Sequence, residues 1–190
     1  TRTELVERVE EVEHDLVRES LRITGVGAGI EIATMADIPS RGSGLGSSSS
    51  VTVGLLHALW TYRGELPTRR QLAEEAYRIE HDLLHRPVGV QDQYAVAFGG
   101  LNHMTFGADG VRVEPAVSDP AVADRLGERL MLFYTGVTRQ AQGVLAPQRA
   151  AIERNRERLR RMAEQAAVGR EMLRDGRFDD FGLLLGEAWQ

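Results

Sequence analysis

The residues from Ile38 to Val51 are rich in glycine and serine and could bind a phosphate group. Glycine lets the backbone approach a bulky anion, and successive amides in such a loop form a positively polarised nest. A strand-like run at 29–36 precedes the loop, and the apolar run 51–60, which favours a buried helix, follows it. The N-terminus of that helix would attract negative charge. Because a flexible linker seldom runs directly into a buried helix, we favour a phosphate-binding loop over a linker.

Two acidic residues downstream could complete a phosphoryl-transfer site, which needs a metal ligand and a group that handles the acceptor hydroxyl. Glu80 lies late in a predicted helix, and Asp92 lies between Pro87 and Tyr94 in a run that we expect to be non-helical. One carboxylate near the loop could hold Mg²⁺ together with a serine hydroxyl. The other could accept or orient the proton of an attacking sugar hydroxyl. Spacing alone leaves this open, because most Asp and Glu residues are surface charges.

The basic residues restrict how a phosphate can be bound. All 23 of them are arginine, and the chain has no lysine. The loop is therefore not a Walker loop, which requires the sequence Gly-Lys-Ser/Thr. Any positive group that contacts a phosphate must be an arginine side chain, a metal ion or a backbone amide.

Composition excludes several classes of function. The 190 residues are 42% hydrophobic, enough for one core or two small ones. The net charge of −5 argues against nucleic-acid and membrane partners, and the arginine-rich stripe 154–161, interleaved with glutamates, is typical of a solvated helix face. The absence of cysteine excludes disulfides and thiol chemistry. With no apolar run of about 18 residues and no signal peptide, we expect a cytoplasmic protein.

The hydrophobic pattern predicts an α+β fold without the regular βαβα alternation of a Rossmann or P-loop domain. Thr68 can cap a helix, and Pro87 disfavours helical backbone at Arg86. The Asp-Gly pair at 109–110 indicates a turn between two strands, and Gly176 ends a helix. The predicted helices cover 4–23, 48–62, 68–85, 147–174 and 178–189, and the predicted strands cover 29–36, 101–106, 111–114 and, as a buried strand, 130–135.

The segment Pro39–Ser49, which contains the run Gly-Leu-Gly-Ser-Ser-Ser, resembles the second signature of the GHMP kinases. Glu80 followed by residues 89–95 resembles their metal-ligand helix and catalytic-aspartate loop. Within that superfamily the chain is most similar to the D-glycero-D-manno-heptose 7-phosphate kinases, a resemblance that rests on the segments 38–50, 86–95, 98–102 and 134–139.

The resemblance implies a role for individual residues. Ser48 and Glu80 would ligate Mg²⁺, and Asp92 would activate the acceptor hydroxyl. The phosphates of the co-substrate ATP would be bound by the loop residues Gly42, Ser43, Gly44, Leu45, Gly46, Ser47 and Ser48. The sugar would contact Gln91, Thr138 and Arg139. Arg139 would meet the phosphate already on the sugar, unless it forms a structural ion pair instead.

The resemblance also implies a fold. Residues 1–115 would form part of the N-terminal ATP-binding domain, which is ribosomal protein S5 domain 2-like, and residues 116–190 would begin the ferredoxin-like C-terminal domain. The family's first and third signatures have no counterpart in the chain, so we expect a fragment truncated at both ends. Val90 stands where the heptose kinases usually have lysine. Oligomeric state is left open.

The expected function is ATP-dependent phosphorylation of D-glycero-D-manno-heptose 7-phosphate at its anomeric hydroxyl. Three alternatives stay open: a galactose or fucose type of sugar kinase, a noncatalytic nucleotide- or sugar-binding remnant, and a zinc hydrolase. The last rests on His81 and His85, spaced like a zincin H-E-x-x-H pair with His103 as a third ligand. Against it, Asp82 is shorter than the required glutamate, and the helix is expected to stop at Arg86.

Overall fold

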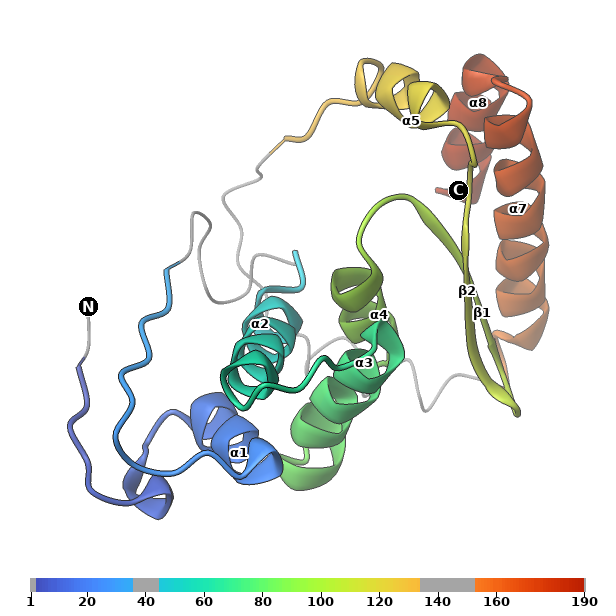
Figure 1. The fold of residues 1–190 in the computed structure, drawn as a ribbon. Helices are drawn as coiled ribbons and strands as arrows, with labels where there is room; N and C mark the ends of the chain where they lie inside the picture. The colour runs from blue at the N-terminus through green and yellow to red at the C-terminus, as the bar shows by residue number, and fades with distance from the viewer. Residues whose placement is uncertain (1–2, 36–44, 134–152, 190) are drawn as a thin grey trace. The chain divides into compact units, whose positions relative to one another are not determined.

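The computed structural model describes residues 3–35, 45–133 and 153–189, which Figure 1 draws in colour. The described residues form two compact units. One holds the residues up to Phe98, and the other begins at Gly99. The two units thus divide between Phe98 and Gly99, before the domain boundary predicted at residue 115. That domain boundary stays a prediction.

The first unit is helical. Its elements are the 3₁₀ turn η1 (Val9–Glu11), α1 (Asp15–Thr24), α2 (Ser47–Tyr62), α3 (Arg69–Tyr77), the π-helical segment η2 (Arg78–Leu83) and α4 (Gln91–Phe98). In Figure 1, α3 and α4 (green) lie side by side, and both contact α2. The Thr68 hydroxyl accepts a hydrogen bond from the Gln71 amide at 3.1 Å, as predicted for a helix cap.

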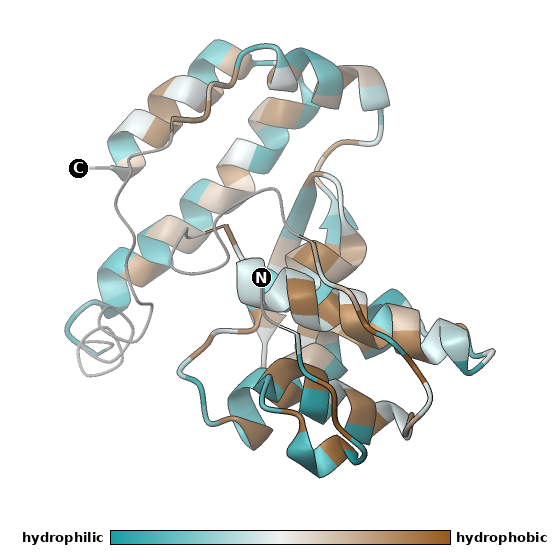
Figure 2. Cartoon of the chain, turned by 90° about the vertical axis from the view of Figure 1, so that its left-hand side faces the viewer, coloured by the Kyte–Doolittle hydropathy of each residue, from teal (hydrophilic) through white to brown (hydrophobic). Residues whose placement is uncertain are grey.

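The helix α3 continues directly into η2, and the two together are called the α3–η2 rod. The core of this unit lies between α1, α2 and this rod. Apolar residues (brown in Figure 2) interleave with polar ones (teal) along the helices, so that each helix can turn an apolar side inward. Leu56 and Ile79 are fully buried at the centre. The buried cluster consists of Leu16, Val53, Leu56, Leu72, Ala76 and Ile79.

The predicted N-terminal helix over 4–23 begins late, at Asp15, and the prediction is wrong for the residues before it. The carboxylate of Glu11 accepts hydrogen bonds from the backbone amides of Glu7 and Arg8, each at 3.3 Å. Those amides are satisfied by a side chain and do not enter a helical ladder. Only the 3₁₀ turn Val9–Glu11 forms in this stretch.

The strand predicted at 29–36 is also wrong over its described residues, 29–35, which belong to no strand. Ile30 and Ile32 pack instead against the second buried cluster, formed by Leu21, Val26 and Leu59. The alternating apolar residues of this segment therefore contact helices and do not form a strand. The period-2 pattern shows which side is buried, but a strand also needs a hydrogen-bonding partner.

The predicted helix at 68–85 has the expected limits but an unexpected second half. Residues 69–77 are α-helical, and Arg78–Leu83 widen into a π-helix. Leu84 closes the helix and His85 takes a left-handed φ of 51° before Arg86 and Pro87, which confirms the predicted stop. Short π-helical segments inside helices occur frequently at functional sites.

The second unit contains an antiparallel hairpin of β1 (Asn102–Gly107) and β2 (Gly110–Pro115), which confirms the predicted pair and its turn. Its described residues also form the helices α5 (Pro120–Gly127), α7 (Arg156–Arg174) and α8 (Phe178–Ala188). Arg170 of α7 pairs with Glu114 of β2 at 3.2 Å. A Cβ at Gly169 would lie 3.1 Å from the Phe181 ring, so α7 and α8 pack closely there.

The buried strand predicted at 130–135 is wrong for residues 130–133, which belong to no strand. Their side chains are 59–84% exposed. The β1–β2 hairpin is the whole sheet among the described residues, and no ladder partner there pairs with this apolar run. The other ends of the predicted elements, 134–135 and 147–152, lie outside the described residues. Among those described, no helix combines the length and apolarity needed to cross a membrane.

Candidate active site

The carboxylate of Glu80 is fully buried and is bound by side chains from two other helices. The Ser49 hydroxyl donates to Oε1 at 3.0 Å from α2, and the Gln93 amide donates to the same oxygen at 3.0 Å from α4. The Ser48 hydroxyl donates to Oε2. Both carboxylate oxygens are thus satisfied, which is the condition for burying such a group at acceptable cost.

Among the described residues, Arg86 brings a positive charge close to this carboxylate. One guanidinium nitrogen, Nη1, lies 2.9 Å from the Ser48 hydroxyl oxygen and 3.9 Å from Glu80 Oε2. The other, Nη2, donates to the carboxylate of Asp15 at 2.7 Å. The Arg86 backbone amide also donates to the Glu80 carbonyl oxygen at 2.9 Å. Arg86 therefore links α1, α2 and the end of η2.

The phosphate loop is described from Leu45 onward, and Gly42, Ser43 and Gly44 lie outside the described residues. Gly46 has a left-handed φ of 66° at the N-cap of α2, a conformation that glycine adopts readily. The helix begins at Ser47, close to the predicted start at residue 48. The dipole of the helix favours an anion at this end.

Asp92 lies beside this helix terminus. A Cβ added at Gly46 would lie 3.8 Å from Asp92 Oδ2, so the loop end and the carboxylate are neighbours. Asp92 is exposed and occupies the first turn of α4, which corrects the prediction of a non-helical run. Pro87 ends only the preceding helix, and an acidic residue in a first turn complements the helix dipole. Gln91, also exposed, precedes it.

Ser48 and Glu80 fit a magnesium ion by their chemistry. A hydroxyl and a carboxylate oxygen are the hard donors that Mg²⁺ prefers, and its remaining positions are usually filled by water and substrate phosphates. The described residues contain no group of three or more His, Cys, Asp and Glu side chains placed for a metal. A metal held by Ser48 and Glu80 would take its further ligands from other groups, such as water or a bound phosphate.

The zinc alternative finds no support in the described residues, which lack such a group. The His81 ring stacks on Tyr77 and its Nδ1 lies 2.8 Å from the Asp82 carboxylate. His85 lies beyond the π-helix with a left-handed backbone. The i, i+4 spacing on one α-helical face, which the motif needs, is thus lost.

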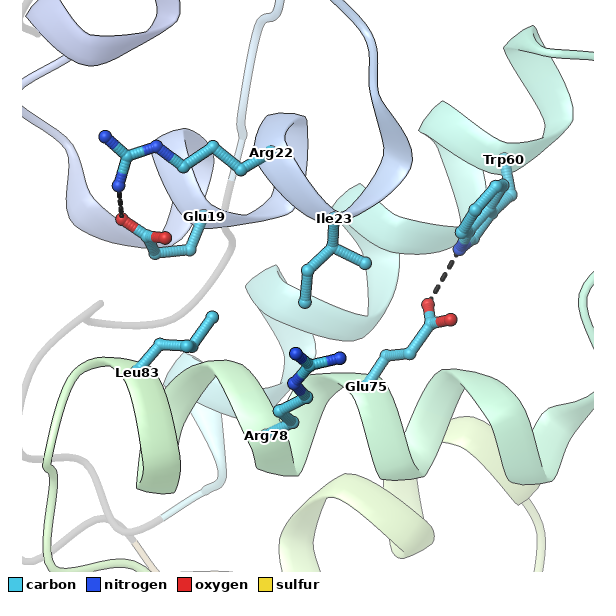
Figure 3. A pocket seen from close by; sticks show the side chains of 7 residues that line it. All are labelled: Glu19, Arg22, Ile23, Trp60, Glu75, Arg78 and Leu83. Atoms are coloured by element: carbon cyan, nitrogen blue, oxygen red, sulfur yellow. Dashed lines mark hydrogen bonds and ion pairs between the residues drawn. The ribbon is translucent and has the colours of Figure 1, made fainter.

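A pocket of about 550 Å³ lies between α1, α2 and the α3–η2 rod. Figure 3 shows the side chains that line it. The Trp60 indole donates to the Glu75 carboxylate there at 2.7 Å, and Glu19 pairs with Arg22 at 2.8 Å. None of the predicted site residues lines this pocket; its lining residues are Glu19, Arg22, Ile23, Trp60, Glu75, Arg78 and Leu83. It belongs to the same helices as Glu80 but is a separate feature.

Comparison with known proteins decides the family. The family described as GHMP kinases N terminal domain matches residues 4–100, half of the chain. The chain belongs to the GHMP kinase family. The match spans the first unit almost completely and includes Ser48, Glu80 and Asp92.

Three relatives extend the GHMP kinase comparison beyond residue 100. A D-glycero-alpha-D-manno-heptose 7-phosphate kinase of Campylobacter jejuni is 32% identical, covering 83% of this chain and 47% of the relative. An L-fucokinase/L-fucose-1-P guanylyltransferase of Bacteroides fragilis is 31% identical over 86% of the chain and 18% of its own length. A crystal structure of a heptose 1-phosphate kinase from Bacteroides thetaiotaomicron superposes with a TM-score of 0.76 at 28% identity, covering 94% of this chain and 55% of the other. The chain spans about half the length of the two heptose kinases.

Sequence reasoning missed the residues that support Glu80. Ser49, Gln93, Arg86 and Asp15 all contribute to its network. Ser49 and Gln93 are adjacent in sequence to the predicted site residues Ser48 and Asp92, and Arg86 lies in the turn between the two motifs. These positions were the signals from which their part in the site could have been predicted. Nothing in the sequence marks Asp15. Thr138 and Arg139 lie outside the described residues.

The Asp15 carboxyl gives this network a pH dependence. Burial raises its pKa, but the hydrogen bond and charge of Arg86, together with the Leu16 amide and the charge of His14, outweigh burial and bring the pKa below its ordinary value of 3.8. Because the pKa of the Asp15 carboxyl is lower in the folded chain than in the unfolded chain, its ionised form stabilises the fold. This stabilisation is fully present above the pKa of the unfolded chain and is lost as the pH falls through the pKa of the folded chain. We expect the free energy of unfolding to fall more steeply between about pH 5 and pH 2 in the unaltered chain than in Asp15→Asn.

Urea unfolding at a series of pH values measures this difference. Glu31→Gln, which removes an exposed carboxylate of the same unit, serves as the control and should follow the unaltered chain. Parallel curves for Asp15→Asn and the unaltered chain would show that the Asp15–Arg86 pair does not contribute to stability.

Proposed function

We propose that this chain carries the nucleotide site of an ATP-dependent sugar kinase. Its acceptor is D-glycero-D-manno-heptose 7-phosphate, and the phosphorylated group is the anomeric hydroxyl. The observation that carries the proposal is the direct contact between the Ser48 hydroxyl and the Glu80 carboxylate, 32 residues apart in sequence. They meet at the N-terminus of α2, with Asp92 beside Gly46.

The named relatives support this substrate class. Two of the proteins that this chain resembles are heptose phosphate kinases by name, from Campylobacter jejuni and Bacteroides thetaiotaomicron. Because the chain spans about half of each, the activity of a whole kinase is itself part of the proposal. So is the division into a nucleotide-binding part, 1–115, and the start of a second domain, 116–190.

In the proposed reaction the sugar hydroxyl oxygen forms a bond to the γ-phosphorus of ATP as the bond to the bridging oxygen breaks, leaving ADP. Amides of the loop and of the α2 N-terminus bind the phosphates. Bound Mg²⁺, held by Ser48 and Glu80, would supply neutralisation of the phosphate charge. Asp92 orients the hydroxyl and accepts its proton. Gln91, Thr138 and Arg139 are proposed sugar contacts.

A fucose kinase is the second candidate, because the Bacteroides fragilis relative is named an L-fucokinase. The phosphate loop contacts only the nucleotide, so it does not discriminate between acceptors. The acceptor must therefore be identified by experiment.

ADP release from Mg²⁺-ATP tests the proposal, with heptose 7-phosphate, L-fucose, galactose or no sugar. Release that depends on heptose 7-phosphate is the expected result. Release that depends on fucose or galactose would show that the chain is a sugar kinase with that sugar, and not the heptose phosphate, as its acceptor. A chain that binds Mg²⁺-ATP without any sugar-dependent turnover would be a noncatalytic nucleotide-binding remnant.

A further inference from the structure

We propose that Arg86, held by Asp15, makes the site select a metal–nucleotide complex over the free metal ion. This inference rests on the proposed function, in which Ser48 and Glu80 hold the metal. In this role Arg86 is not a metal ligand. It positions the Ser48 hydroxyl and changes the charge beside the Glu80 carboxylate.

The hydrogen bonds at Ser48 determine which of its lone pairs is available. A hydroxyl has one proton and two lone pairs. The proton is donated to Glu80 Oε2, and one lone pair accepts the Arg86 Nη1–H at 2.9 Å. One lone pair is left for a further ligand. Arg86 therefore holds the Ser48 oxygen in a fixed orientation beside the carboxylate.

The charges at the site make a free dication bind weakly. The Arg86 guanidinium lies 3.9 Å from Glu80 Oε2 and is 29% exposed, so solvent screens it incompletely. Its positive charge offsets that of Glu80 and repels a cation that approaches the same oxygen. The complex of a metal ion with a polyphosphate carries net negative charge, so the same guanidinium and the α2 N-terminus attract it.

Asp15 determines where the guanidinium lies. Its carboxylate binds Nη2 at 2.7 Å, on the nitrogen that does not contact Ser48. The two arms of the planar guanidinium are thus tied to α1 and α2, a geometry that lysine, with a single nitrogen, does not reproduce. The contact with Asp15 restrains the side chain beside the metal ligands before any nucleotide binds.

Two affinities measured side by side test this role. One is for Mn²⁺ alone, counted by electron paramagnetic resonance, and the other is for the Mg²⁺ complex of a non-hydrolysable ATP analogue, measured by calorimetry. In Arg86→Gln, which keeps a polar N–H donor but carries no charge, we expect Mn²⁺ to bind several-fold more tightly. The Mg²⁺–analogue complex should bind about tenfold more weakly, in line with the loss of a charge-assisted contact.

Opposite changes in the two affinities are the signature of selectivity, because a merely structural role would weaken both. Arg86→Lys retains the charge and should keep Mn²⁺ binding weak even if its hydrogen bonds are imperfect. Arg22→Gln is the matched control, since Arg22 pairs with the buried Glu19 in α1 and should leave both affinities unchanged. Circular dichroism establishes that each variant is folded.

The outcomes separate this inference from the proposed function. If the unaltered chain binds the Mg²⁺–analogue complex and Arg86→Gln lowers both affinities or neither, the selectivity role is overturned and the nucleotide site stands. If the unaltered chain binds no Mg²⁺–analogue complex, both the nucleotide site and the role of Arg86 are overturned.

Discussion

Replacing Asp92 by asparagine is expected to lower sugar-dependent ADP release by about 10²- to 10⁴-fold, the usual contribution of a positioned acid or base. Asparagine keeps the size of the side chain but cannot accept the hydroxyl proton. The fold should hardly change, because Asp92 is exposed and its interaction with the α4 dipole contributes only about 0.3–1 kcal/mol. Steady-state kinetics with saturating Mg²⁺-ATP and heptose 7-phosphate measure the loss.

A matched variant separates chemistry from charge. Asp179 is exposed in the first turn of α8, the position that Asp92 has in α4, so Asp179→Asn should retain full turnover. The affinity for the Mg²⁺–ATP analogue should remain within a fewfold in Asp92→Asn, because the loop amides and Ser48 are unchanged. Turnover in Asp92→Asn equal to that of Asp179→Asn would remove Asp92 from the reaction.

Replacing Glu80 by glutamine is expected to destabilise the first unit by about 3 kcal/mol, in the lower part of the range for breaking a buried charge pair. Three donors, from Ser48, Ser49 and Gln93, converge on this carboxylate. A glutamine NH₂ group would face at least one of them, leaving buried donors unpaired. The change would also remove the carboxylate charge that lies 3.9 Å from the Arg86 guanidinium. Urea unfolding followed by circular dichroism measures the loss of stability.

Metal-dependent stability provides a second measurement on Glu80→Gln. The Mg²⁺–ATP analogue should raise the melting temperature of the unaltered chain and have little effect on the variant, since a ligand stabilises only the state that binds it. Glu75→Gln is the control: its partly buried carboxylate accepts from Trp60 but is remote from the proposed ligands, so we expect a cost of about 1 kcal/mol. Equal stability of Glu80→Gln and Glu75→Gln would contradict the role assigned to the buried network.

Several elements could be predicted because their signals are local. The helix after the loop was expected at 48–62 and spans Ser47–Tyr62, since an apolar run follows the glycines. Thr68 caps α3 through its own side chain, and Pro87 restricts the residue before it. The Asp-Gly turn signal found the β1–β2 hairpin. In each case a few consecutive residues contain the deciding interaction.

The failed predictions concern elements whose formation depends on a partner. Residues 29–35 and 130–133 have strand-like composition, yet neither belongs to a ladder among the described residues. A strand satisfies its backbone groups only through a neighbour, whereas a helix satisfies them within itself. The π-helical turn Arg78–Leu83 could not be foreseen either, because composition does not distinguish a wide turn from an ordinary one.

The sequence by itself determined the candidate residues Ser48, Glu80 and Asp92, through residue type, spacing and resemblance to the family that the comparisons then showed. Only the tertiary structure decided how those residues are held. Glu80 is bound from 31, 32 and 13 residues away, and Arg86 is tied to Asp15 across 71 residues. Such contacts arise when α1, α2 and α4 pack around η2. That packing cannot be predicted from residues that are neighbours in sequence. Motifs identify chemical groups, and the fold sets their charges and hydrogen bonds.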